Sequence, residues 1–310
     1  MKKMILITCL AIMSLIIISY FLISTTQNFS YQTSINATRT AVSRQIINKD
    51  KWQSWWPGGK LNDTLYSYGD CNYLIKKILL NGAEITIVNK NDSIKGFLQF
   101  DDYGIDSTQF QWTSNHIFSS NPLKRFSEYY QLLKVHKNIK DLLKGIKKYF
   151  DNQENVYGMK IEEEKITQSS LISVKDTFLY YPSTKEIYNM IQSLENYILK
   201  VNGEKVGFPM LHIREGGPNK FVTMVAIPTK TVLPSENKIL LKQMVIGSPI
   251  LVSKIKGGVQ TIINGEMELS NYVNDYHKLS PAIPFQSLVT NRLSEPDSTK
   301  WVTKLYYPVF

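Results

Sequence analysis

Side chains that could do acid–base or metal chemistry are few and scattered in this chain of 310 residues. The histidines His116, His136, His212 and His277 stand singly, with no cysteine, histidine or carboxylate at the spacing of a metal site. The chain has no Gly-x-Ser-x-Gly, no phosphate-binding loop and no His-Glu-x-x-His. The acidic run Glu162–Glu164 is typical of a solvated strand start. We therefore expect no metal and no cofactor, and the catalytic residues of any enzyme here are unknown.

The best candidates for binding lie on two strand-like segments near the C-terminus, residues 221–228 and 301–307. Alternate side chains of a strand point to the same side of its sheet, so each segment offers one set to a binding face. Alternation leaves both sides of each strand open, and the family resemblance of residues 159–310 given below implies that the set containing Lys304, with the matching positions of the other segment, faces the ligand. The predicted binding residues are Val302, Lys304, Tyr306, Met224 and Ala226.

These two segments belong to an internal repeat. Phe221–Pro228 is echoed by Trp301–Pro308, and Leu194–Ile198 is echoed by Leu269–Val273, in the same order and at nearly the same spacing. Two such echoes indicate one duplicated supersecondary unit. Each copy is predicted to be a strand, an amphipathic helix and a hairpin whose last strand stops at a proline. Two copies side by side predict a curved sheet with both helices on one face and a free face that can hold a ligand.

The boundaries of the copies follow from local patterns. The first is predicted to open with a strand over 159–178 and to continue with a helix that begins at Ser183, where Glu186 completes a capping box. The second opens with a strand over 240–255 and continues with a helix over 259–277. The predicted domain is therefore 159–310, and the fold class is α+β.

The N-terminus carries an apolar run. Residues 4–24 follow Lys2 and Lys3 and contain no charged side chain. A helix of that length reaches across a hydrocarbon core of about 30 Å. We expect an uncleaved membrane anchor within residues 1–25, with a cleaved signal peptide as the alternative. The lysines favour an inside N-terminus and an extracytoplasmic globular part, a single-pass membrane protein, although arginines at 39 and 44 weaken this bias.

Residues 26–152 have the order of elements of a helix-grip fold. An alternating strand near residue 30 is followed by a short helix, several strand-like runs with turns, and a long helix from Pro122 to about Phe150. The apolar stripe expected to hold that helix on the sheet consists of Leu123, Phe126, Tyr130, Leu133, Ile139, Leu142, Ile146 and Phe150. Lysines cover the rest of the helix, as a solvated face or as a surface for anionic lipid.

The tryptophan-rich segment Trp52-x-x-Trp55-Trp56-Pro57 follows the first strand and helix. With that segment, residues 26–152 resemble the START-like, polyketide-cyclase-like superfamily (SRPBCC). The resemblance implies a cavity between sheet and long helix that takes an apolar ligand, with Trp55 and Trp56 as candidate contacts. The alternative is that these indoles are simply core.

Residues 159–310 resemble the GyrI-like (SOUL-like) small-molecule-binding domain. The resemblance lies in the duplicated pattern, Tyr181-Pro182-Ser183, Gly257-Gly258 and the terminal Thr303-x-x-Tyr306-x-Pro308. It implies a pseudo-twofold sheet whose concave face binds a ligand, often a hydrophobic cation met by a glutamate directly after that threonine. Here Lys304 holds the position. A cation would be repelled, so the resemblance implies a neutral or anionic ligand.

The net charge of +10 is compatible with nucleic acid, an anionic membrane surface or a solvated basic face. With no helix-turn-helix, zinc spacing or RNA-binding aromatic motif, we expect no nucleic-acid partner. Two functional hypotheses remain. One is a membrane-anchored protein that binds a hydrophobic small molecule, with a second ligand possible in the START-like domain. The other is a hydrolase or cyclase acting on such a molecule, since relatives of both families include enzymes.

Overall fold

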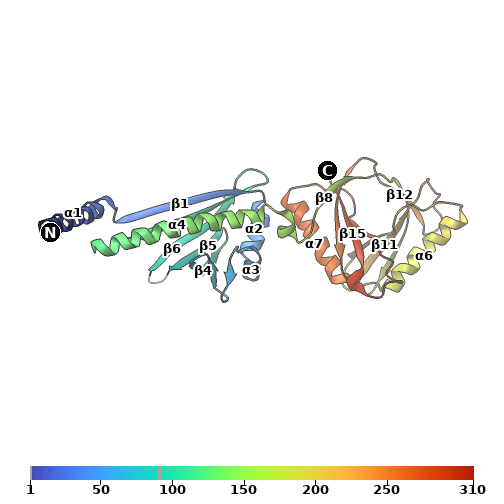
Figure 1. Ribbon diagram of the computed structural model, residues 1–310. Helices are drawn as coiled ribbons and strands as arrows, with labels where there is room; N and C mark the ends of the chain where they lie inside the picture. The colour runs from blue at the N-terminus through green and yellow to red at the C-terminus, as the bar shows by residue number, and fades with distance from the viewer. Residues whose placement is uncertain (1, 90–91) are drawn as a thin grey trace. The chain divides into compact units, whose positions relative to one another are not determined.

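The chain folds into two compact units, Met1–Val156 and Tyr157–Phe310, called unit 1 and unit 2 below (Figure 1). The computed structural model describes residues 2–89 and 92–310. Both units are α+β, and each contains one antiparallel sheet. The predicted fold class is therefore confirmed at this level.

Unit 1 contains most of the chain's long strands and its longest helix. In chain order its elements are α1 (Lys2–Leu22), β1 (Thr26–Ile35), α2 (Arg39–Ile46), the 3-10 turn η1 (Lys49–Lys51), α3 (Trp52–Trp55), β2 (Gly59–Lys60), β3 (Leu65–Tyr68), β4 (Cys71–Leu79), β5 (Gly82–Asn89), β6 (Asp92–Asp102), β7 (Thr108–Ile117), α4 (Pro122–Phe150) and α5 (Gln153–Tyr157).

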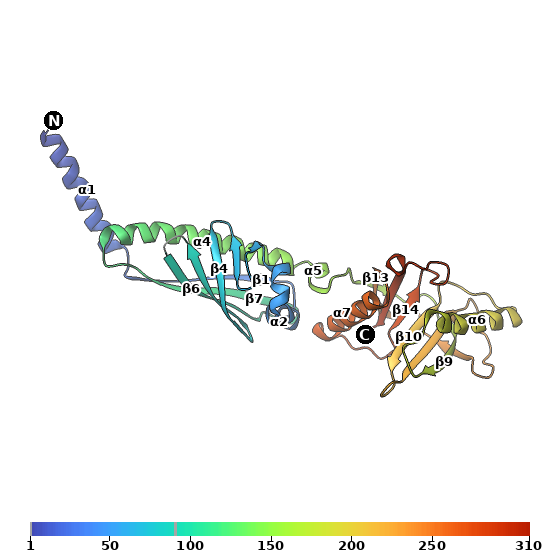
Figure 2. The same cartoon turned by 90° about the horizontal axis from the view of Figure 1, so that it is seen from below.

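The sheet of unit 1 has the order β1-β7-β6-β5-β4-β3-β2. Its first strand thus pairs with its last, and the short helices between β1 and β2 lie at one end, as Figure 2 shows. α4 runs along the sheet and contacts β1. The predicted order of elements, a strand, short helices, antiparallel strands and a closing helix, is what the unit shows.

Aromatic side chains fill the space between this sheet and α4. Trp55 and Trp56 are only 1% and 3% exposed. The indole N–H of Trp55 donates to the Gln45 carbonyl at 3.3 Å, and that of Trp56 donates to the Ser67 carbonyl at 3.1 Å. Their neighbours in this core include Trp52, Tyr66, Tyr73, Phe110 and Phe150. Both indoles are therefore part of a packed core with satisfied hydrogen bonds.

The apolar stripe predicted for α4 divides into two faces. Ile139, Leu142, Ile146 and Phe150 are buried, as expected. The first four members of the stripe are exposed, and Leu132 and Val135 take their place in the core. Six residues separate position 133 from position 139, a rotation of about 600° around the helix axis, or 240° beyond one full turn. Ile139 therefore lies on a different face of the helix from Leu133. The prediction of one continuous stripe was wrong.

The predicted membrane anchor, residues 4–24, coincides largely with α1. Within the described residues, no helix combines the length and the apolar character needed to cross a bilayer. The anchor is therefore not supported by the structure, and it stays a prediction together with the membrane location and the orientation.

Unit 2 contains the predicted repeat. Its elements are β8 (Glu162–Lys165), β9 (Ser170–Phe178), α6 (Thr184–Lys200), β10 (Met210–Glu215), β11 (Phe221–Pro228), β12 (Leu240–Gln243), β13 (Pro249–Lys256), α7 (Val259–Asp275), β14 (Phe285–Leu288), the 3-10 turn η2 (Ser298–Lys300) and β15 (Val302–Pro308).

The two echoes fall on corresponding elements. One pair forms strands β11 and β15, and the other lies in helices α6 and α7, where Leu194 and Leu269 are both buried. Ser183 caps α6 in the predicted capping box with Glu186. The duplication read from the sequence is thus present in the fold.

The opening strand of each copy differs from the prediction. Residues 159–178 form two strands, and so do residues 240–255. The sheet order is β12-β9-β11-β10-β14-β15-β13-β8, so the first short strand of each copy pairs with the other copy (Figure 1). Only four residues join β8 to β9, and such a link reaches no more than about 18 Å. The sheet must therefore curl to bring β8 near β9.

Both long helices of unit 2 cover the same face of this curled sheet (Figure 2). α6 packs on Leu211, Val225 and Ile227, and a Cβ at Gly265 of α7 would meet Leu305 and Ile255. The alternate residues of these strands face the concave side. The predicted arrangement, two helices on one face and an open second face, is what unit 2 shows.

Candidate ligand-binding cavity

The concave face of unit 2 carries the residues predicted from strand alternation. Met224 and Ala226 on β11 alternate with Thr223, Val225 and Ile227, which are buried. On β15, buried Thr303 and Leu305 likewise alternate with the predicted set. The strand pairing extends the same face across β10, because Met210 lies opposite Ala226 and His212 lies opposite Met224.

The two links between swapped strands bind each other across the open side of the sheet. Residues 166–169 and 244–248 form this pair, called the strap below. The Ile166 amide donates to the Ser248 carbonyl at 3.0 Å, and the Gly247 amide donates to the Ile166 carbonyl at 2.8 Å. At the other end the Met244 amide donates to the Ser169 carbonyl at 2.8 Å, and the Ser169 hydroxyl donates to the Met244 carbonyl at 2.9 Å. The strap is therefore held at both ends.

A cavity of about 410 Å³ lies between the concave face and the strap. This central cavity is within the size range of small-molecule sites, about 300–1,000 Å³. Most side chains around it are apolar. Its walls are formed by Leu171, Met210, Met224, Ala226 and Phe285 of the sheet, Ile166, Met244 and Val245 of the strap, and Pro281, Ala282 and Ile283 of the loop before β14.

Two titratable side chains line the central cavity, His212 and Lys242. Because the Pro284 carbonyl can only accept, the contact of 2.8 Å to His212 Nδ1 requires a proton on that nitrogen. Burial lowers the pKa of His212, with a smaller contribution from Arg214 in the same direction. The imidazole is therefore neutral near pH 7, and Nε2 is the nitrogen able to accept a hydrogen bond. No acidic side chain occurs among the described residues that line this cavity.

Two smaller cavities adjoin the central one. One of about 180 Å³ shares His212 and Phe285 with it and is also lined by Tyr306 and Glu266. Burial raises the pKa of the Glu266 carboxyl. The other, about 190 Å³, shares Met210 and Met244 with the central cavity and again includes Tyr306. The Tyr306 ring stacks on Phe285, with centroids 5.0 Å apart and planes at 14°. Tyr306 thus stands between the side cavities.

The predicted binding residues are only partly brought together. Met224 and Ala226 line the central cavity, and Tyr306 lines the side cavities. Lys304 is on the same strand face but pairs with Ser287 and Lys254, and neither Lys304 nor Val302 borders these three cavities. Trp55 and Trp56 lie in the core of unit 1. Ligand binding by any of these residues stays a prediction.

Sequence patterns missed the strap and the loop before β14. Their cavity-lining residues come from segments between strands, where neither the period of a strand nor that of a helix applies. The sequence presents His212 only as one of several single histidines; its spacing of two residues from Met210, which also lines the cavity, is the signal that could have found it. Across residues 2–89 and 92–310, no three His, Cys, Asp or Glu side chains gather closely enough to hold a metal ion.

No protein-family model and no curated protein matches this chain. Several solved structures are similar to it. The C-terminal domain of EcmrR is 15% identical, with a TM-score of 0.42 over 49% of this chain and 98% of that domain. EcmrR in its DNA complex is 16% identical, with a TM-score of 0.44 over 62% of this chain and 72% of that one.

A third similar structure is a hydrolase from Listeria innocua, 12% identical, with a TM-score of 0.39 over 49% of this chain and 92% of that one. None of these structures shows the START-like resemblance of residues 26–152 or tests the expected absence of a nucleic-acid partner. What this chain does is therefore inferred from its cavity.

Proposed function

We propose that unit 2 is a small-molecule-binding domain that holds an apolar, neutral or anionic ligand in the central cavity. The observation that carries the proposal is an apolar cavity of about 410 Å³ enclosed between a rigid sheet face and the strap. The resemblance of residues 159–310 to GyrI-like domains agrees with this function. Because the interior of unit 1 is filled by aromatic side chains, the proposal places the ligand in unit 2.

The lining supports an adaptable apolar site. Met210, Met224 and Met244 border the cavity, and methionine side chains adjust to ligands of different shape. Lys242 and the neutral His212 are the polar groups able to orient a ligand. With a lysine at the cavity and no acidic side chain among the described lining residues, an anionic or neutral apolar molecule is favoured over a cation.

Filling the cavity tests the proposal. Ala226→Phe places a benzyl group where the methyl group of Ala226 borders the cavity. Val222→Phe, on the same face of β11 but outside the lining, is the matched control. The probes are 1-anilinonaphthalene-8-sulfonate, which is apolar and anionic, and tetraphenylphosphonium, which is apolar and cationic. Binding is measured by fluorescence and by calorimetry.

We expect the anionic probe to bind the unchanged protein more tightly than the cationic one. Ala226→Phe should raise the Kd of the anionic probe by at least about tenfold. Val222→Phe should change that Kd by less than about twofold. Equal loss in both variants, with both still folded, would contradict a site in the central cavity. Product analysis after incubation with apolar esters and amides shows whether bound molecules are also turned over.

A further inference from the structure

The exposed half of α4 is an apolar feature of unit 1 that the proposed function does not use. Leu123 is 67% exposed, Phe126 57%, Tyr130 56% and Leu133 46%. Their spacing of three, four and three residues places all four on one face of the helix. This face, called the outer stripe below, points away from the buried face that contains Leu132 and Val135. Side chains of this size in water indicate a surface that is covered by something else.

Basic side chains accompany the outer stripe. Lys134 and Lys137 are exposed beside it, and the ammonium group of Lys134 lies 4.8 Å from the ring centre of Tyr130. Farther along the same face, the apolar residues give way to Lys144 and Lys148, which are also exposed. An apolar, aromatic patch with a lysine border is the pattern of helices that lie in a membrane interface, where rings enter the headgroup region and ammonium groups meet lipid phosphates.

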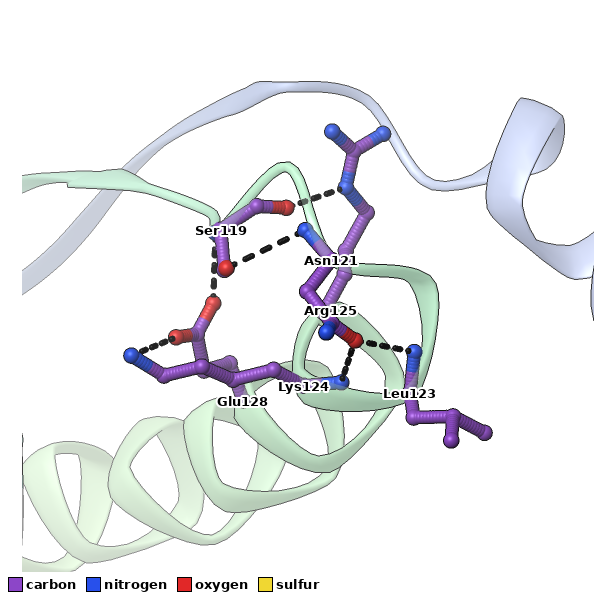
Figure 3. A network of polar contacts seen from close by, with 6 residues as sticks. All are labelled: Ser119, Asn121, Leu123, Lys124, Arg125 and Glu128. Carbon is purple, nitrogen blue, oxygen red and sulfur yellow. Dashed lines mark hydrogen bonds and ion pairs between the residues drawn. The ribbon is translucent and has the colours of Figure 1, made fainter.

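A polar clasp fixes α1 beside the start of this stripe. Arg125 is 4% exposed, and its guanidinium lies over the Tyr20 ring, 4.0 Å from the centroid. Its Nη1 donates to the carbonyls of Tyr20 and Ile23 at 3.4 and 3.5 Å. Its Nε donates to the Ser119 carbonyl at 2.9 Å, as Figure 3 shows. The guanidinium thus bonds to carbonyls at the C-terminal end of α1, where a cation is favoured by the helix dipole.

The start of α4 is itself rigid. Asn121 caps the helix through the amides of Leu123 and Lys124, and the Glu128 carboxylate accepts from the Ser119 amide at 2.7 Å (Figure 3). Beside this corner, α1 leaves Phe21 and Leu22 80% and 79% exposed. Arg125 thus holds the end of α1, with its exposed Phe21 and Leu22, close to the start of α4.

We infer that the outer stripe docks on an anionic lipid bilayer, with its side chains in the headgroup region and Lys134 and Lys137 against lipid phosphates. Charge complementarity selects this occupant, because a protein partner for an apolar stripe would not require the lysine border. Contact by α4 is independent of whether α1 crosses the bilayer.

The chain offers a direct reporter for this contact. All five native tryptophans are buried, the most exposed being Trp301 at 8%. A tryptophan introduced at Phe126 is therefore the one that lipid-borne quenchers can reach. The experiment uses the full chain carrying Phe126→Trp and vesicles of brominated phosphatidylcholine with or without phosphatidylserine. The matched control is Ile105→Trp, since Ile105 is 85% exposed in the loop before β7, at the end of that strand remote from the start of α4.

We expect the tryptophan at position 126 to lose at least about half of its added fluorescence and to shift to the blue, more so with phosphatidylserine. The tryptophan at position 105 should lose little of its fluorescence. In Phe126→Trp with Lys134→Gln and Lys137→Gln, the response to phosphatidylserine should fall toward that of neutral vesicles. Equal quenching at positions 126 and 105 would overturn the inference. So would a blue shift that depends on protein concentration and occurs without lipid, because it would identify a second copy of the chain as the occupant.

Discussion

Ile166 and Ser248 are joined by a backbone hydrogen bond of 3.0 Å although they belong to different copies of the repeat. Each lies directly beside a strand that pairs with the other copy, Ile166 after β8 and Ser248 before β13. The exchange of edge strands therefore does two things. It ties the halves of the sheet together, and it places a strap over the concave face, which turns an open surface into a cavity.

The strap gives the first prediction. Gly247 has φ of +81°, and a Cβ there would meet no atom within 4 Å, so Gly247→Ala introduces backbone strain without a clash. Strain of this kind costs roughly 1–2 kcal/mol. We expect lower stability of unit 2 and weaker binding of the anionic probe. Gly217→Ala is the control, because Gly217 has φ of +132° with equally open space, in the β10–β11 hairpin. It should lose stability but keep the affinity, as measured by denaturation and by titration.

Lys304 provides the second prediction. Since it pairs with Ser287 and Lys254 and borders none of the three cavities of unit 2, its charge acts on the ligand only from a distance. Lys304→Glu should change the Kd of either probe by less than about threefold, because salt screens charges that do not touch the ligand. Lys242 lines the cavity itself, so Lys242→Glu should lower the affinity for the anionic probe and raise the affinity for the cationic probe. A large gain in cation affinity from Lys304→Glu would place Lys304 in the site.

The third prediction separates core from ligand site in unit 1. Trp55 is 1% exposed, and its indole donates to the Gln45 carbonyl. Trp55→Ala should lower the stability of unit 1 by about 3–5 kcal/mol, the range for a large buried aromatic. Probe binding at temperatures where the variant is folded should be unchanged. If binding falls while stability holds, the START-like interpretation of this residue is correct.

The sequence predicted the repeat and both of its helices, because the echoes are local patterns, and the alternation of residues 221–228 grouped Met224 and Ala226, which both line the central cavity. It did not predict which strands pair. Residues 159–178 have the composition of one strand, and nothing local shows that β8 turns away to pair with β13. The choice is made by long-range pairing, which also creates the strap. The long helix shows the same limit, since both of its faces contain apolar residues and only tertiary packing decides which one is buried.

Burial of neutral histidines gives the fourth prediction. The pKa of His136 is lowered by burial and, to a smaller extent, by Lys140 and His116; the His136 ring centroid lies 4.1 Å from that of Phe29. Below about pH 6.5 the His136 side chain binds a proton more readily in the unfolded chain than in folded unit 1. The free energy of unfolding of unit 1 therefore falls as the pH falls. Four of the five tryptophans lie in unit 1, so their fluorescence reports its unfolding. The urea midpoint should decrease from pH 7.5 to 5.5, and the decrease should be smaller in His136→Phe. An equal decrease would contradict this role.

The clasp on α1 gives the fifth prediction. Arg125→Lys keeps the charge but loses the planar group that bonds to Ser119 and stacks on Tyr20. We expect faster hydrogen exchange at the amides of residues 20–25 and earlier proteolysis between α1 and β1. Lys124→Ala is the control, since Lys124 is exposed and makes one ion pair, with Glu128. Unchanged exchange in Arg125→Lys would show that α1 is held by other contacts.

Hydrogen exchange of unit 2 with and without bound 1-anilinonaphthalene-8-sulfonate tests the central claim most directly. If the ligand lies between the concave face and the strap, the strap amides of Ile166, Met244 and Gly247 should exchange more slowly when the probe is bound. The Gly216 amide, which closes the distant β10–β11 hairpin through Lys220, should be unaffected. Slower exchange around Trp55 and Trp56 in unit 1, with no change in the strap, would contradict the account.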